Sequence, residues 1–195
     1  ETKAGDLGIF SCKMKVRNVD EAYRQFKESG INVFGSPSPD PAGKKSFFIS
    51  DPYGNIFHIV EATDWFMNLK NISGGAYGAI IGVTNIEAAS GLYKDILGYD
   101  NVVYDVTGKF DDLASVPGGK GTFRRVMLSF SKPLRGAFSQ LFGQSVIELI
   151  EARDREVSKI FDGRYWGDPG FIHLCYDING MDNLRKYCSE KGFPF

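Results

Sequence analysis

The chain has 195 residues, of which 43% are hydrophobic, and its formal net charge at pH 7 is −1. This length and composition allow a normal hydrophobic core in one large or two small domains. The charge gives no basic surface for nucleic acid or anionic lipid, and no apolar run approaches the roughly 20 residues of a membrane span. We therefore expect neither nucleic acid nor a membrane as a partner.

The cysteine content favours a reducing compartment. There are three cysteines, Cys12, Cys175 and Cys188, and their spacing matches no metal cluster. An odd number of cysteines argues against a disulfide framework. The first residues also lack the shape of a signal peptide. We expect a cytoplasmic protein.

One strand pattern occurs twice, as FHIVEA at 57–62 and IELIEA at 147–152. His58 in the first copy matches Glu148 in the second, and each neighbouring position agrees in kind. Side chains alternate between the two faces of a strand, so equivalent residues point to equivalent faces. We therefore expect His58 and Glu148 to occupy matching places and to point to the concave face of a repeated structure.

The segments around the first copy are typical of one βαβββ unit. Its expected elements are a strand at 7–16, a helix from Asn18, strands at 31–34 and 46–50, and the strand at 57–62. Asn18, with Glu21 three residues later, predicts a capped helix start. The sequence Asp-Pro-Tyr-Gly-Asn at 51–55 predicts a hairpin turn, because proline presets one dihedral angle and glycine takes the positive one.

The same order recurs further along the chain. The second unit has an expected strand at 76–83, a helix capped by Asn85, and strands at 101–106, 124–131 and 145–152. A third unit begins with a strand at 170–178 and a helix capped by Asn179, and it stops at Phe195 in its second strand. The sequence therefore predicts an α+β fold of repeated βαβββ modules at 5–68, 74–156 and 168–195, the last of them truncated.

A repeated βαβββ unit, with an Asp-Pro-X-Gly-Asn turn before a strand that carries a possible ligand, resembles the vicinal oxygen chelate superfamily. That group includes glyoxalase I, methylmalonyl-CoA epimerase, extradiol dioxygenases, and the fosfomycin and bleomycin resistance proteins. The segments that carry the resemblance are 51–58, 145–149 and 166–174. The resemblance implies mixed, curved sheets that form a cup with the helices outside. It also implies that the second and third units pair, and that the first unit is the second half of another pair.

By the same resemblance, a divalent metal binds inside the cup through the first and last strand of each module. The last-strand positions are His58 and Glu148, and the first-strand positions are Ser11, Gly78 and His173. Serine is a poor metal ligand, and glycine has no side chain. The resemblance therefore implies a site of Glu148, His173 and a carboxylate outside the chain, for Zn²⁺, Ni²⁺, Co²⁺, Mn²⁺ or Fe²⁺. We expect the ion to be absent or weakly held in this fragment.

Two of these residues also allow a structural role. His58 can be a hydrogen-bonded core histidine, which its partner Ser11 favours over a metal ligand. Glu148 lies among apolar neighbours, so a buried carboxylate there needs a partner. We therefore favour a functional role for Glu148, as a metal ligand and as the catalytic carboxylate.

Other residues are candidates for a substrate pocket. Arg124 and Arg125 alternate across one expected strand, so one of the two faces the cavity and can bind an anionic substrate. We assign Arg124 to the pocket. Cys175, on the same face of its strand as His173, and Trp166, at the mouth, complete the expected lining.

The resemblance implies a metal-dependent lyase or isomerase of the glyoxalase I type, which acts on a small oxygenated substrate through a stabilised enediolate. Two alternatives stay open: a metal-free small-molecule-binding protein of the bleomycin-resistance type, and an extradiol dioxygenase. Gly78 stands where the dioxygenase needs a histidine, which disfavours ring cleavage. A homodimer, or pairing of modules between chains, is one way to complete the cups.

Overall fold

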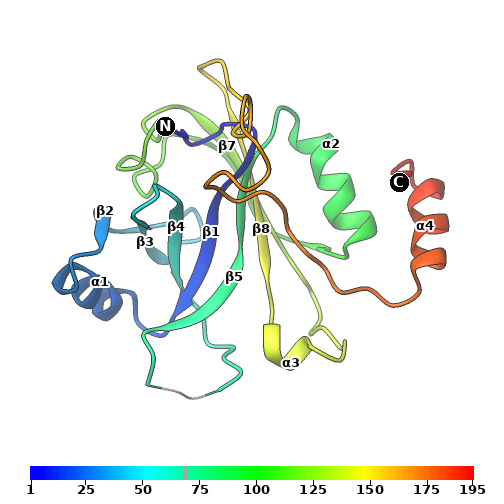
Figure 1. Ribbon diagram of the computed structural model, residues 1–195, viewed down its shortest axis with the longest axis horizontal. Coiled ribbons are helices and arrows are strands. Elements are labelled where there is room, and N and C mark those ends of the chain that lie inside the picture. Colours follow the sequence, from blue (N-terminus) through cyan, green and yellow to red (C-terminus); the bar gives the residue numbers. More distant parts are fainter. Residues whose placement is uncertain (68–69) are drawn as a thin grey trace.

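The computed structural model describes residues 1–67 and 70–195 of the chain. Its eight strands form one mixed, curved sheet in the order β2-β3-β4-β1-β5-β8-β7-β6 (Figure 1). The elements are, in chain order, β1 (Gly8–Val16), α1 (Val19–Glu28), β2 (Asn32–Pro39), β3 (Lys45–Ser50), β4 (Ile56–Glu61), β5 (Ser73–Gly82), α2 (Ile86–Gly91), a π-helical turn (Leu92–Ile96), β6 (Asn101–Gly108), β7 (Phe123–Ser129), α3 (Ser139–Phe142), β8 (Val146–Ala152) and α4 (Met181–Glu190). None of the described helices is long and apolar enough to cross a membrane.

The sheet is built from two βαβββ units that join along one seam. In each unit the last strand runs parallel to the first, with β4 beside β1 and β8 beside β5. The two units meet where β1 and β5 run antiparallel. The expected α+β fold of repeated βαβββ modules is confirmed. In this structure the first unit shares the sheet with the second. The expected pairing of the second and third units stays a prediction.

The helices of both units begin at the expected caps. The Asn18 side chain accepts a hydrogen bond from the backbone N–H of Glu21 at 2.8 Å, and Asn85 accepts one from the N–H of Ala88 at 2.8 Å. Each bond satisfies a backbone donor that the first helical turn leaves free. The helix of each unit therefore starts directly after the first strand of that unit.

The turn between β3 and β4 also follows the sequence prediction. The Asp51 carboxylate accepts hydrogen bonds from the backbone N–H groups of Tyr53 and Asn55, each at 2.9 Å. Gly54 adopts a φ of 84°, which glycine takes without steric cost. This tight turn sets the register that places His58 within β4.

The segment 170–178, expected as a strand, forms none. It crosses the helix-covered side of the sheet, where the Phe171 ring meets Phe57 edge-on at 5.3 Å and Leu174 packs beside the core under α2. A strand needs a neighbour to pair its backbone groups, and the described sheet offers this segment none. Side-chain packing places the segment instead.

The module boundaries at 5–68, 74–156 and 168–195 stay predictions. Residue 68, the expected end of the first module, lies outside the described residues. In the third range, α4 is the regular element, and Gly180 occupies its N-cap position. The expected cap, Asn179, precedes that position by one residue.

The two faces of the sheet are covered differently. α1 and α2 pack on one face, over buried clusters that include Ile59 and Leu149. The opposite face, called the concave face below, carries a third cluster that includes Phe48. The loop 109–122 between β6 and β7 adds Leu113 to this cluster. The loop therefore covers part of the concave face, and side chains beneath it are buried.

Candidate functional site

His58 and Glu148 lie on the concave face, at equivalent places on β4 and β8. Neither side chain is exposed to solvent. Their strand neighbours Ile59 and Leu149 pack under the helices, so the alternation along each strand turns His58 and Glu148 to the other face. The expectation that these two residues share the concave face is confirmed.

Lys13 joins the two residues. It lies on β1 directly opposite His58 on β4, and its side chain is buried. The Lys13 Nζ lies 2.9 Å from His58 Nδ1 and 2.7 Å from Glu148 Oε2. An ammonium group only donates hydrogen bonds, so Nδ1 is the acceptor and the ring proton lies on Nε2. The imidazole is therefore held in one tautomer, and the lone pair of Nδ1 is in use.

Gly78 lies on β5 beside Lys13, between the strands of Lys13 and Glu148. Lys13 and Gly78 are direct partners between β1 and β5, and β5 separates β1 from β8. A glycine places no side chain in the path of the lysine stem. A Cβ added at Gly78 would also clash with the backbone carbonyl of Val146 on β8. Gly78, which stands at an expected ligand position, is thus a point of close approach between strands.

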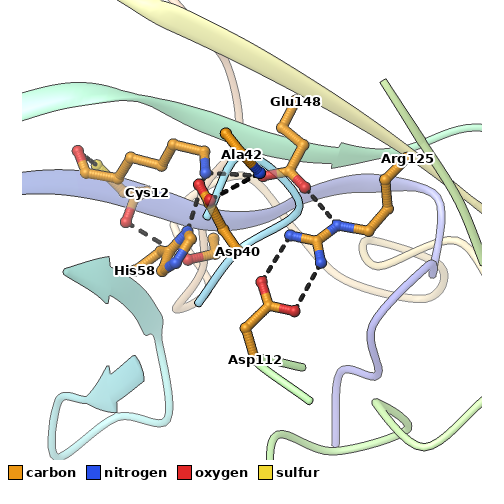
Figure 2. A network of polar contacts seen from close by, with 9 residues as sticks. Cys12, Asp40, Ala42, His58, Asp112, Arg125 and Glu148 are labelled. Atoms are coloured by element: carbon orange, nitrogen blue, oxygen red, sulfur yellow. Dashed lines mark hydrogen bonds and ion pairs between the residues drawn. The ribbon is translucent and has the colours of Figure 1, made fainter. Parts of the chain in front are cut away.

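Arg125 on β7 extends these contacts to a second carboxylate. Its Nε donates to Glu148 Oε1 at 2.6 Å, and its two Nη groups donate to the Asp112 carboxylate at 2.7 and 2.8 Å. Asp112 comes from the loop 109–122 and is buried. Paired N–H groups on one carboxylate make a strong and directional contact. The resulting buried series, called the ion chain below, consists of Asp112, Arg125, Glu148, Lys13 and His58 (Figure 2).

Aromatic rings close the ion chain off from water. The Phe48 ring stacks on the His58 imidazole, with ring centroids 4.2 Å apart and planes at 6°. The Arg125 guanidinium lies 4.7 Å from the ring centre of Phe110 and 5.9 Å from that of Tyr104. Charges shielded from water attract each other more strongly, and an unpaired charge there is costly. The loss of one charge from the ion chain is therefore destabilising.

The ion chain holds defined protonation states. Burial, and next the Lys13 ammonium, keep the pKa of His58 well below its usual range. Burial alone would raise the pKa of Glu148, but Arg125 and Lys13 outweigh it, so this pKa is lowered. His58 is therefore neutral and Glu148 is ionised near pH 7. The Glu148 and Asp112 carboxylates then balance the two cations.

The donor set of the ion chain does not fit a divalent metal. A metal ligand must direct a free lone pair at the ion, yet His58 Nδ1 and Glu148 Oε2 both face the Lys13 ammonium. A divalent ion between them would also stand beside two positive charges, Lys13 and Arg125. In the part of the chain that the structure describes, no three His, Cys, Asp or Glu side chains are grouped so that they could hold a metal. The surroundings of His58 and Glu148 therefore do not support their expected metal role.

The structure does not bring His173 to Glu148. His173 is exposed and stacks on Trp166, with ring centroids 5.5 Å apart and planes at 7°. Its segment crosses the helix-covered side, whereas Glu148 lies on the concave face. Trp166 is 78% exposed, and Cys175 is exposed as well. A shared site of Glu148 and His173 is thus not formed here, and the pocket role of Trp166 and Cys175 stays a prediction.

Arg125, and not Arg124, takes the arginine position on the concave face. Arg124 turns to the opposite side of β7, where it donates two hydrogen bonds to Asp105 at 2.9 Å each and contacts Glu87 of α2. The alternation of the strand predicts that one arginine faces inward, and the structure corrects which one. The reason is the partner of each residue, since Arg125 meets the buried Glu148 while Arg124 meets carboxylates near the surface.

Sequence reasoning misses two members of the ion chain, Lys13 and Asp112, and selects Arg124 in place of its neighbour Arg125. A signal for Lys13 exists, because this lysine lies in an apolar strand two residues from Ser11, and therefore on the same face. A lysine at such a position must find a buried partner. Asp112 gives no comparable signal, because it lies in a loop whose course depends on the packing of the whole unit.

Comparison with known proteins gives a family match. The profile of the Glyoxalase/Bleomycin resistance protein/Dioxygenase superfamily matches residues 79–195, which is more than half of the chain. No significant match is found among curated protein sequences.

Several solved structures match as well. Glyoxalase I from Zea mays is 15% identical, with a TM-score of 0.48, over 79% of this chain and 46% of that chain. Methylmalonyl-CoA epimerase from Mycobacterium tuberculosis is 15% identical, with a TM-score of 0.41, over 78% of this chain and 94% of that chain. A superfamily member from Sphaerobacter thermophilus is 34% identical, with a TM-score of 0.26, over 32% of this chain and 47% of that chain. This chain spans about half the length of the glyoxalase I structures that it matches. On the profile match to residues 79–195, the chain belongs to the glyoxalase/bleomycin resistance protein/dioxygenase superfamily.

Proposed function

We propose that the full-length protein is a lyase or isomerase of the glyoxalase type that acts on a small oxygenated substrate. We further propose that the eight-stranded unit, residues 8–152, is its metal-independent part. Membership of the superfamily supports the reaction class. One observation supports the metal independence of residues 8–152: the Lys13 ammonium occupies the space between His58 and Glu148. A cup whose candidate ligands already bind a cation serves as a scaffold and not as a chelating site.

The ion chain suits a scaffold because it crosses the seam between the two βαβββ units. Lys13 and His58 belong to the first unit, and Glu148, Arg125 and Asp112 belong to the second. The Lys13–Glu148 pair therefore fixes the two units to each other from the concave side. Removing one partner of such a buried pair leaves a charge uncompensated, which is strongly destabilising.

The chemistry of the full-length protein is then assigned to the segment around His173. This histidine is exposed, and its described ring contact is the stack on Trp166. The profile match extends through the segment. His173 would supply one metal ligand, with the remaining ligands from outside the chain, and a divalent metal bound there supplies Lewis-acid stabilisation of an enediolate.

The test uses the full-length protein with two single variants, His173→Gln and Glu148→Gln. Bound metal is measured by elemental analysis, and turnover is measured with a dicarbonyl hemithioacetal. We expect His173→Gln to lose metal and turnover, and Glu148→Gln to keep its metal while its Tm falls. Loss of metal from a folded Glu148→Gln protein, with metal retained in His173→Gln, would assign the metal to the eight-stranded unit and contradict the proposal.

A metal-free binding protein of the bleomycin-resistance type is the second candidate, and the occupied cup favours it. Absence of both stoichiometric metal and turnover in the full-length protein, together with calorimetric binding of a flat aromatic ligand, would support this candidate. An extradiol dioxygenase is less well supported. His58 is bound to Lys13 on the concave face, and His173 lies in a segment on the helix-covered side, so the two histidines do not converge.

A further inference from the structure

We infer that Lys13 is the resident cation of the concave face: its ammonium occupies a cation site between His58 and Glu148, and a divalent metal can bind there once the lysine side chain is removed. The inference deepens the proposed function and rests on its claim that the eight-stranded unit is metal-independent. The test below measures stability and metal binding, and not turnover. The inference can therefore fail while the lyase or isomerase assignment stands.

The position of the Lys13 Nζ is that of a bound cation. It meets an imidazole nitrogen at 2.9 Å and a carboxylate oxygen at 2.7 Å. Donors of these two kinds bind Zn²⁺, Co²⁺ and Ni²⁺ in proteins. The site is shielded from water, since Lys13 is 2% exposed and both of its partners are 0% exposed. The Lys13 ammonium thus takes the place of a free cation between two residues of types that bind metals.

Charge balance requires a cation at this point. The ion chain contains two carboxylates, of which Arg125 compensates one and Lys13 the other. Without Lys13, the buried series has an excess negative charge, which must be neutralised by a proton or by a cation from solution. Shortening the lysine to alanine also leaves room beside His58 Nδ1 and Glu148 Oε2. The vacated space then offers a metal ion two donors, one imidazole nitrogen and one carboxylate oxygen, and an excess negative charge, while Arg125 stays bound to Glu148.

Lys15 provides a matched control. It lies two residues further along β1, on the same face, and is also 2% exposed. Its Nζ donates to the backbone carbonyl of Asp64 at 2.8 Å and lies 3.6 Å from the Asp64 carboxylate. Both acceptors are oxygens of one residue. The substitution Lys15→Ala therefore removes a buried lysine of the same strand without freeing a histidine and a glutamate.

The experiment compares the unaltered protein with Lys13→Ala, Lys15→Ala and the double variant Lys13→Ala/His58→Ala, all purified in chelator. Tm is measured with and without Co²⁺, and Co²⁺ binding is followed by its visible absorption. We expect Lys13→Ala to melt about 10 °C lower in chelator, which is the shift for a broken buried pair in a chain of this size. We expect it to recover part of this loss with Co²⁺ as it binds about one equivalent. The other three proteins should show no recovery.

Ethylammonium is a second probe, because it carries the same charged group as the removed side chain. It should raise the Tm of Lys13→Ala and leave that of Lys15→Ala unchanged. A folded Lys13→Ala protein that gains stability from neither Co²⁺ nor ethylammonium would overturn the inference. So would one equivalent of Co²⁺ bound by the unaltered protein and lost in His58→Ala. Co²⁺ binding by the unaltered protein and by His58→Ala tests the inference even where Lys13→Ala does not fold.

Discussion

Lys13 and Glu148 form an ion pair of 2.7 Å across an intervening strand, with 2% and 0% of their side chains exposed. The pair spans β5, where Gly78 presents no side chain, and it joins the first strand of one unit to the last strand of the other. A buried ion pair of this kind is sensitive to the loss of either partner, because the remaining charge has no access to water.

Replacing Glu148 with glutamine should lower the free energy of unfolding by about 3–5 kcal/mol. The substitution keeps the shape of the side chain but leaves the Lys13 and Arg125 cations without their shared carboxylate. Urea unfolding of the purified chain measures the change. Glu61→Gln is the control, since Glu61 lies at the exposed end of β4, and it should cause no measurable change. Equal effects of the two substitutions would contradict the central place of Glu148 in the ion chain.

The stability of the protein should fall as the pH drops below about 6.5, which is the usual pKa of histidine in an unfolded chain. His58 has a lowered pKa in the fold, so the unfolded state binds one more proton in this range. The free energy of unfolding then decreases by about 1.4 kcal/mol per pH unit from this residue. His58→Gln, which keeps an acceptor for Lys13, should flatten the slope. His173→Gln, at an exposed position, should leave the slope unchanged, and a flatter slope in this control would remove His58 as the cause.

Arg125→Lys should destabilise the protein by about 2–4 kcal/mol. A lysine has no planar fork of donors, so it cannot hold the Asp112 carboxylate through two bonds and Glu148 through a third. Arg124→Lys, on the neighbouring residue and the opposite face, should cost about 1 kcal/mol or less because its partners lie near the surface. Chemical denaturation of both variants gives the comparison. A larger loss in Arg124→Lys would mean that the two arginines are assigned to the wrong faces.

Gly78→Ala should prevent normal folding or cost several kcal/mol, since overpacking in a tight core is costly and the added Cβ meets the rigid backbone carbonyl of Val146. Gly136→Ala is the matched control, because a Cβ there meets nothing within 4 Å. The soluble yield and thermal unfolding of both variants can be compared directly. A Gly78→Ala protein as stable as Gly136→Ala would show that β5 and β8 are further apart than described.

Much of the fold could be predicted because its signals are local. The caps Asn18 and Asn85 mark the helix starts, and the turn at 51–55 marks the hairpin before β4. The doubled strand pattern places His58 and Glu148 at equivalent positions on one face. Each of these signals acts within a few residues of the chain, so the sequence expresses it directly.

The partners within the site could not be predicted in the same way. Strand alternation puts Lys13 on the face of Ser11, but the pairing of β1 with β5 decides that its side chain reaches Glu148. That pairing is a contact between units, and the sequence pattern favours a different partner for the second unit. The position of Asp112 depends on the path of a loop over the concave face. The expected strand at 170–178 does not form for a related reason. Its sequence pattern is typical of a strand, but the described sheet has no neighbouring strand with which it could pair.

Lys13, the cation between His58 and Glu148, is covalently part of the polypeptide. It cannot dissociate, exchange with a competing ion or be withdrawn by a chelator. Sites made of nitrogen and oxygen donors otherwise accept whichever transition metal is available in the order of intrinsic affinity, with copper and zinc favoured over manganese and iron. A lysine at this position removes the eight-stranded unit from that competition. If the unit is metal-independent, as proposed, it reaches the same folded state during metal starvation and metal excess, and among the described residues no group of three His, Cys, Asp or Glu side chains offers a wrong metal a ligand set.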